Sequence, residues 1–244
     1  MKDLLGYDKV DIAIKRMQEF EPPEGLYLAF SGGKDSIVLK KLADMAGVKY
    51  DAHMSLTTVD PIEVLHYIKD YHPDVYMDKP KKSMWQLILD NHMPPTRLAR
   101  FCCRELKEVG GMNRLCLTGI RAEESNQRKK RSIVEQCRSD PRKRYLHPII
   151  DWTKDEIWQF IYNNHLPYCS LYDEGFDRIG CVLCPMTSNK KFQIKRFPKF
   201  YRAYMHTFDK LVKTYDVSWK TAQEVMDWWL SNKSNNTDDK GLFT

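Results

Sequence analysis

The sequence predicts an α/β protein in which a parallel, twisted sheet is flanked by helices and followed by a mainly helical C-terminal region. Short apolar runs, typical of buried strands, alternate along the chain with amphipathic stretches of helical spacing. This alternation is typical of parallel sheets with helices on both faces. With 244 residues, 42% of them hydrophobic, the chain is long enough for one large domain and a small appended module.

In the first half of the chain, apolar spacing predicts a helix over residues 8–20, and a short apolar run predicts a strand over 26–30. A glycine-rich loop comes next, followed by a helix over 37–45. The pattern then predicts a strand over 50–56 and a helix over 61–71. A ligand-binding loop after the first strand is expected at the carboxyl edge of the sheet.

In the second half, the pattern predicts helices over 84–91, 153–164, 190–215 and 218–230 and a strand over 115–118. Thr153 and Glu156 have the spacing of a capping box at the start of one of these helices. We therefore predict two domains. They are a nucleotide-binding domain over 1–188, which carries the cysteines, and a helical extension over 189–244.

Composition narrows the class of protein. No run of about 18 apolar residues is present, and the first residues lack the apolar stretch of a signal peptide, so we expect a cytoplasmic protein without a membrane partner. Seven cysteines in such a protein indicate metal binding, redox chemistry or burial rather than disulfides. The net charge of +6 weakly favours a polyanionic partner such as a nucleotide or nucleic acid.

The glycine-rich loop has the chemistry of a phosphate-binding site. Glycines allow the backbone to approach an anion closely, the following helix N-terminus directs amides toward it, and a lysine adds a positive charge. The loop is not a Walker A motif, because Leu28 stands where that motif needs a glycine and no Ser or Thr follows the lysine. The predicted phosphate-binding residues are Ser31, Gly32, Gly33, Lys34, Asp35 and Ser36.

Residues 31–36 resemble the PP-loop of the adenine nucleotide alpha-hydrolase superfamily, which includes ATP pyrophosphatases, tRNA thiolation enzymes and sulfonucleotide reductases. In its ATP-using members this loop holds pyrophosphate while the α-phosphate is attacked. The resemblance implies that the present chain binds an adenine nucleotide, either ATP or adenylyl sulfate. Mg²⁺ is expected with ATP, to neutralise phosphate charge.

Four cysteines form two close groups in the sequence. Cys102 and Cys103 are adjacent, and Cys181 and Cys184 form a Cys-x-x-Cys pair. Thiolates suit zinc or iron–sulfur clusters. Adjacent cysteines bind a single ion poorly, whereas a four-iron cluster offers separate corners, so we favour a 4Fe–4S cluster over zinc or simple burial.

The run from Phe101 to Lys107, paired with Cys181 and Cys184, resembles the cluster signature of iron–sulfur adenylyl-sulfate reductases. Further segments between residues 26 and 188 resemble the same family, and they occur in the same order along the chain. The resemblance therefore implies a member of the phosphoadenylyl-sulfate/adenylyl-sulfate reductase-like family. One of these segments resembles the substrate segment of that family and includes Gly119, Arg121, Ser125 and Arg128.

Among these residues we predict catalytic roles for Lys34, Asp35 and Arg121, the last because a guanidinium binds phosphate or sulfate bidentately. Thr57 and Asp60 follow the second predicted strand and by position would contact the adenosine. Asp60 could equally act as the N-cap of the next helix, with a proline at the first helical position.

The sequence departs from the reductase pattern in one respect. Sulfonucleotide reductases carry a nucleophilic cysteine in a C-terminal Glu-Cys-Gly-type motif, whereas residues 185–244 contain no cysteine. Three hypotheses follow. The first is an ATP pyrophosphatase that adenylates an acceptor for sulfur transfer. The second is a true reductase that uses another thiol, such as Cys137, Cys169 or an external one. The third is a non-catalytic nucleotide and cluster sensor.

The expected partners follow from these hypotheses. They are a tRNA or DNA acceptor and a thioredoxin-like or sulfur-donor protein, while the oligomeric state is not predicted. Basic segments occur over 128–131, 138–144 and 190–202, and the last also contains Phe192, Phe197, Phe200 and Tyr201, as in a nucleic-acid-binding surface. The aromatic residues of the last segment also fit the spacing of a helix core.

Overall fold

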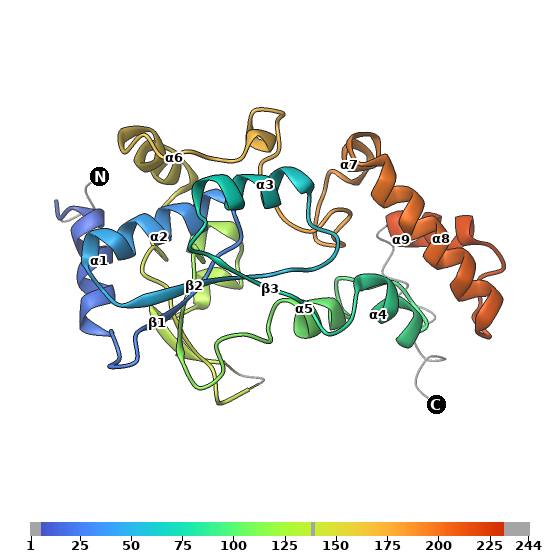
Figure 1. Cartoon of the computed structure of the whole chain (residues 1–244), viewed down its shortest axis with the longest axis horizontal. Helices are drawn as coiled ribbons and strands as arrows, with labels where there is room; N and C mark the ends of the chain where they lie inside the picture. Colours follow the sequence, from blue (N-terminus) through green and yellow to red (C-terminus); the bar gives the residue numbers. More distant parts are fainter. Residues whose placement is uncertain (1–5, 138–139, 232–244) are drawn as a thin grey trace. The chain divides into compact units, whose positions relative to one another are not determined.

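A computed structural model describes residues 6–137 and 140–231 of the chain (Figure 1). It divides into two compact units. The first unit comprises residues up to Leu56, Asp60–Lys79 and Glu108–Gly180. The second unit comprises Thr57–Val59, Pro80–Lys107 and the residues from Cys181 onward. The predicted boundary between residues 188 and 189 stays a prediction.

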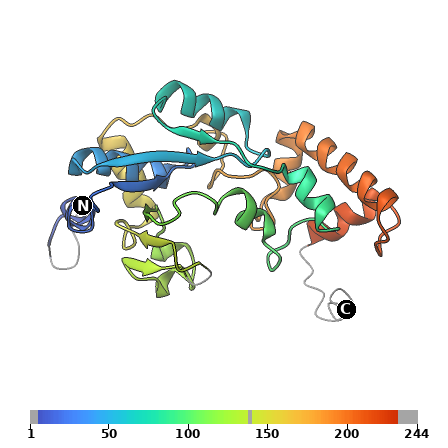
Figure 2. The same cartoon turned by 60° about the horizontal axis from the view of Figure 1, so that its bottom comes forward.

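A six-stranded sheet forms the centre of the first unit, with the order β3-β2-β1-β4-β6-β5. Four strand pairs are parallel, and β5 pairs with β6 in the antiparallel direction (Figures 1 and 2). This arrangement confirms the predicted mostly parallel α/β class. The strands are β1 (Leu26–Ala29), β2 (Tyr50–Ser55), β3 (Tyr76–Asp78), β4 (Leu115–Leu117), β5 (Val134–Gln136) and β6 (Arg144–Leu146).

Helices of the first unit alternate with these strands. Their bounds are α1 (Lys9–Glu19), α2 (Lys34–Ala46), α3 (Ile62–Tyr71) and α6 (Lys154–Asn163). The capping box predicted for α6 is present, because Thr153 accepts from the amide of Glu156 and Glu156 accepts from that of Thr153. In α3 the N-cap is Pro61, so the alternative assignment of Asp60 as N-cap is wrong.

The core of the first unit follows from the strand and helix patterns. Leu26 and Leu28 on β1 are fully buried, as are Leu39 and Leu42 on α2. Burying such side chains contributes about 1.5–3 kcal/mol each. Because β1 is both central and apolar, the loop that leaves it starts from a fixed position.

The second unit is mainly helical. Its helices are α4 (Met84–Asp90), α5 (Phe101–Leu106), α7 (Lys190–Arg196), α8 (Pro198–Thr214) and α9 (Ala222–Ser231). Helix α8 packs against α4 and α9, with Tyr204 and Phe208 against Trp229. The single helix predicted over 190–215 is wrong. The chain breaks at Phe197, whose backbone leaves helical geometry before Pro198 starts α8.

Other differences concern short elements. The three-residue strands β3, β5 and β6 and the six-residue helix α5 carry too few residues to show a period, so the sequence pattern did not predict them. Among the described helices, none combines the length and apolarity needed to cross a membrane. Some residues to which the sequence analysis refers lie outside the described part of the chain, namely 1–5, 138–139 and 232–244.

Candidate functional site

The predicted phosphate loop connects β1 to α2 in the first unit. Gly32 has a φ of +69°, and a Cβ there would lie 2.8 Å from Cγ1 of Val64. Only glycine suits both constraints. Ser36 closes the loop, because its Oγ donates to the carbonyl of Gly33 at 2.8 Å and accepts from the amide of Ser31 at 3.2 Å. The hydroxyl of Ser36 therefore fixes the conformation of the loop backbone.

The loop leads into the N-terminus of α2, and an anion binds favourably at such a helix end. The amide of Lys34 donates to the hydroxyl of Tyr172 at 2.8 Å. No residue in the described part of the chain accepts from the amides of Gly32 and Asp35. The oxygens of a phosphate group could accept hydrogen bonds from these two amides.

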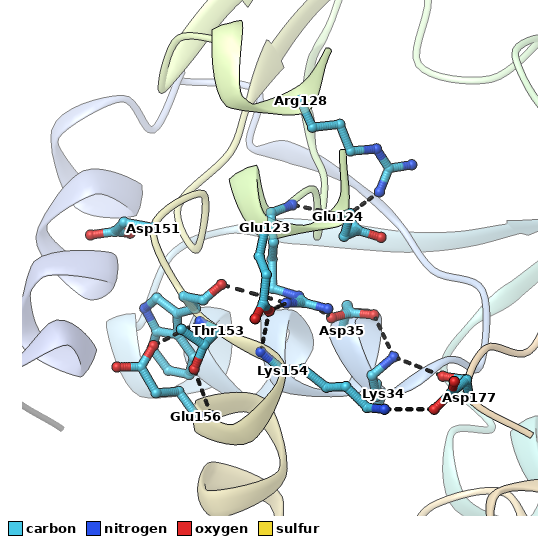
Figure 3. Close-up of polar contacts among 12 residues, drawn as sticks. Lys34, Asp35, Glu123, Glu124, Arg128, Asp151, Thr153, Lys154, Glu156 and Asp177 are labelled. Carbon is cyan, nitrogen blue, oxygen red and sulfur yellow. Dashed lines mark hydrogen bonds and ion pairs between the residues drawn. The ribbon is translucent and has the colours of Figure 1, made fainter. Parts of the chain in front are cut away.

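Three charged residues meet at the start of α2 (Figure 3). One carboxylate oxygen of Asp35 lies 2.7 Å from Nε of Arg121, and the other lies 3.4 Å from Nζ of Lys34. Both cations are buried, with relative exposures of 4% each. Two buried cations share the carboxylate of Asp35, and Arg121 has Glu123 as a second partner, so Lys34 is the less neutralised of the two cations. The structure thus brings together the three residues predicted to be catalytic.

Arg121 has further partners that fix its position. Its guanidinium also lies 2.8 Å from Glu123, and its amide donates to Glu124 at 3.0 Å. Burial opposes the charged form of Arg121, but Asp35 and the glutamates outweigh burial and raise the pKa of the guanidinium. Arg121 is therefore a permanent cation.

The glycine predicted beside Arg121 has a packing role. A Cβ at Gly119 would lie 3.1 Å from the backbone of Asp35, so a larger residue would push α2 away. Ser125 accepts from the amide of Arg128 and caps a short turn. The guanidinium of Arg128 forms an ion pair with Glu124. In this structure, Arg128 therefore neutralises a glutamate near Arg121.

The sequence did not predict that a segment containing Tyr172 and Asp177, here called the strap, contacts the phosphate loop. Tyr172 reaches the amide of Lys34, and the carbonyl of Asp177 accepts from Nζ of Lys34 at 3.2 Å. Lys154 donates to the carboxylate of Asp177 at 2.5 Å (Figure 3). Burial raises the pKa of the Tyr172 phenol, so this group stays protonated. Tyr172 stood within a run matched to the family, but no sequence pattern reveals that it contacts a loop 138 residues away.

A hollow of about 270 Å³ adjoins the strap within the first unit. The rings of Trp158 and Tyr172 meet edge to face at 5.0 Å, and Tyr168 meets Trp158 at 5.2 Å. Lys154 and Asp177 stand at its rim. The hollow therefore has aromatic walls and a charged rim. Trp158 lines this hollow and is half-buried.

The predicted adenosine contacts divide between the units. Asp60 belongs to the first unit and is buried. Thr57 belongs to the second unit, where its hydroxyl accepts from the thiol of Cys181 at 3.4 Å. No described contact tests a role for either residue in nucleotide binding, so both assignments remain predictions.

All four clustered cysteines belong to the second unit, Cys102 and Cys103 on α5 and Cys181 and Cys184 on the loop before α7. The hydrogen bond between the first two raises the pKa of Cys102 and lowers that of Cys103, and Cys181 and Cys184 add to the electrostatic field at Cys102. Within residues 6–137 and 140–231, no three His, Cys, Asp or Glu side chains are close enough for one ion. Thiolates of these cysteines are soft donors of the kind that suits zinc or iron–sulfur clusters.

The other cysteines differ in exposure. Cys116 lies inside β4 and is buried. Cys169 is 1% exposed, and burial raises the pKa of its thiol, so the prediction that it is a reactive thiol is wrong. A turn-like sequence did not reveal that this residue packs inward. Cys137 is half-buried.

Comparison with known proteins identifies relatives of the chain. The family model for the phosphoadenosine phosphosulfate reductase domain matches residues 25–187. The adenosine 5'-phosphosulfate reductase of Oceanobacillus iheyensis is 37% identical over 208 residues, which cover 75% of this chain and 81% of that protein. An uncharacterized protein of Methanocaldococcus jannaschii is 31% identical over 192 residues, covering 72% of this chain but only 46% of that relative.

Solved structures share the fold at low identity. Phosphoadenylyl-sulfate reductase from Candida auris, in a phosphate complex, gives a TM-score of 0.54 at 18% identity and covers 74% of this chain and 91% of that chain. An FMN adenylyltransferase from Candida glabrata gives 0.52 at 14% identity, with 77% and 72% covered. The family match and the bacterial relative carry the assignment: the chain belongs to the phosphoadenosine phosphosulfate reductase family, as the ordered matches over residues 26–188 predicted.

Proposed function

We propose that this chain binds ATP at loop 31–36, releases pyrophosphate and adenylates an acceptor that then receives sulfur. Membership of the family supports an enzyme that acts on an adenine nucleotide. The observation that carries the choice of ATP is the pair of buried cations, Lys34 and Arg121, beside free loop amides. Pyrophosphate carries more negative charge than the phosphosulfate of adenylyl sulfate, so it gains more from this arrangement.

The proposed step needs no oxidant or reductant. An oxygen nucleophile of the acceptor attacks the α-phosphorus of ATP, and the bond from that phosphorus to the oxygen bridging the β-phosphate breaks. The electron pair leaves with pyrophosphate, and the acceptor retains AMP. The loop amides and Lys34 hold the leaving group, and its growing charge is stabilised by the ammonium. Arg121 is the candidate for the α-phosphate, and Mg²⁺ would neutralise part of the remaining charge.

Pyrophosphate release tests this proposal. The anaerobically prepared protein is incubated with ATP and Mg²⁺ and with candidate RNA or DNA acceptors, and pyrophosphate is measured by a coupled assay. We expect release in the native protein, a loss of at least tenfold in Arg121→Met, and native rates in the control Arg104→Met, whose guanidinium is exposed. Native rates in Arg121→Met would overturn the assigned site.

A second candidate is a true sulfonucleotide reductase, which the relative from Oceanobacillus iheyensis favours because that protein is named as such a reductase. This route needs a thiolate that attacks the sulfur of adenylyl sulfate, displaces AMP and is later reduced by a dithiol. Outside the four clustered cysteines, Cys137 is the thiol with solvent access among the described residues. Sulfite release from adenylyl sulfate with dithiol, abolished in Cys137→Ser, would support reduction. Nucleotide binding without either product would support a sensor.

We further propose that Cys102, Cys103, Cys181 and Cys184 hold a 4Fe–4S cluster. Their soft thiolates and their gathering in one unit support this assignment. When bound, such a cluster supplies a positively polarised iron–sulfur centre. We expect a brown anaerobic protein with iron and labile sulfide, lost in Cys181→Ser and kept in Cys116→Ser. Stoichiometric zinc without iron would contradict the assignment.

A further inference from the structure

The positive charge of this protein is concentrated in one short segment. Residues 190–214 contain eight Lys and Arg residues and one Asp, a net charge of +7. The remainder of the chain has 31 basic and 32 acidic residues, a net charge of −1, against +6 for the whole chain. The segment forms α7 and α8 of the second unit (Figure 1).

Helix α8 separates its apolar and basic residues onto opposite sides. At about 100° per residue, Lys199, Arg202, His206, Lys210 and Lys213 fall within an arc of about 80°. All five are exposed. The opposite side carries the buried residues that pack on α4 and α9. These are Tyr204, Thr207, Phe208 and Leu211.

Three basic residues of the segment have partners within the second unit. Lys190 is buried and donates to the carbonyl of Trp229 at 3.0 Å, Arg196 packs on the ring of Phe197, and Lys213 pairs with Asp209 at 2.8 Å. In the described part of the chain, the remaining basic side chains are exposed to solvent and form no ion pair. These are Lys191, Lys195, Lys199, Arg202 and Lys210.

We propose that this basic stripe, defined by Lys191, Lys195, Lys199, Arg202 and Lys210, binds the phosphate backbone of a polynucleotide. From Lys199 to Lys210 the stripe extends about 16 Å along the helix, and that length of duplex carries many phosphates. Arginine and lysine in such a row provide the electrostatic, sequence-independent part of nucleic-acid binding. The proposal is independent of the nucleotide reaction, because it concerns residues outside the phosphate loop.

Other anionic partners fit less well. A membrane-surface helix needs an exposed apolar face, but the apolar side of α8 is buried in the second unit. A protein interface needs an apolar centre, and the stripe has none. Among the aromatic residues near it, Phe197 and Tyr204 are buried and Phe192, Phe200 and Tyr201 are partly covered, so none presents a fully exposed ring for stacking. Phosphate contact, rather than base stacking or readout, is therefore the chemistry that the stripe offers.

The test measures the affinity of the full chain for fluorescently labelled 20-nucleotide probes over a series of salt concentrations. Duplex and single-stranded RNA and DNA are compared, with anionic phospholipid vesicles as the alternative ligand. The triple variant Lys199→Gln, Arg202→Gln, Lys210→Gln, called the stripe variant, neutralises the three stripe residues on α8. Its control, Lys15→Gln, Lys69→Gln, Lys81→Gln, removes the same charge from exposed sites elsewhere.

We expect binding of at least one nucleic acid that weakens steeply with salt. The stripe variant should bind at least tenfold more weakly, and the slope of log K against log salt should fall by about 2 to 3, at about 0.9 per lost phosphate contact. The control should retain the native slope. Equal losses in both variants, no binding by the native chain, or binding to vesicles alone would overturn the proposal. Unchanged pyrophosphate release in the stripe variant would show that the basic stripe and the phosphate loop can be inactivated separately.

Discussion

Replacement of Lys34 by methionine is the most informative perturbation of the phosphate loop. The ammonium group is buried, 3.4 Å from a carboxylate oxygen of Asp35 and 3.2 Å from the carbonyl of Asp177. Methionine keeps much of the side-chain volume and removes the charge. Asp35 retains its contact with Arg121 at 2.7 Å, so the carboxylate does not become an unpaired buried charge.

The expected loss of affinity follows from the geometry. A hydrogen bond to a charged group contributes about 1.5 to 3 kcal/mol. A full Coulomb interaction at about 4 Å with an effective dielectric constant of about 20 gives about 4 kcal/mol as an upper bound. At about 1.4 kcal/mol per tenfold change, Lys34→Met should weaken binding of ATP or pyrophosphate by about 10- to 150-fold.

Isothermal titration calorimetry with ATP, adenylyl sulfate and inorganic pyrophosphate measures this loss directly. Lys41→Met is the matched control, because it lies on the same helix and makes no ion pair among the described residues. Thermal unfolding checks that both variants fold. If Lys34→Met binds all three ligands with native affinity while the fold is intact, the assignment of loop 31–36 as the phosphate site is refuted.

Two further predictions concern stability. Gly32→Ala should lower the free energy of unfolding by about 2 to 4 kcal/mol, from left-handed backbone strain and from a clash with Val64, measured by urea denaturation. Gly47→Ala, with a φ of +66° and open space around it, should lose only the strain term, and equal losses would contradict the clash. Burial alone would raise the pKa of Asp51, but the hydrogen bonds and charges of Arg114 and His53 together outweigh it and lower that pKa. The stabilisation is therefore present above pH about 4 and lost as pH falls through the folded pKa, so Asp51→Asn should cost about 1 kcal/mol at neutral pH and less in acid. An identical difference in stability at both pH values would argue against this linkage.

The sequence alone determined the fold class, most long elements and the phosphate loop. Leu26 and Leu28 mark a buried strand and the glycines mark the turn after it, so local composition predicts a strand, loop and helix in that order. The cysteine pairs and the ordered matches to a family were equally visible. Each of these signals lies within a few neighbouring residues.

Only the tertiary structure decided which distant groups meet. It brought Asp35 to Arg121 across 86 positions and Tyr172 to Lys34 across 138. It also buried Cys169 and broke the last long helical pattern at Phe197. The physical reason is that burial and side-chain pairing depend on how strands and helices pack, and spacing along the chain specifies only which face of its own element a residue occupies.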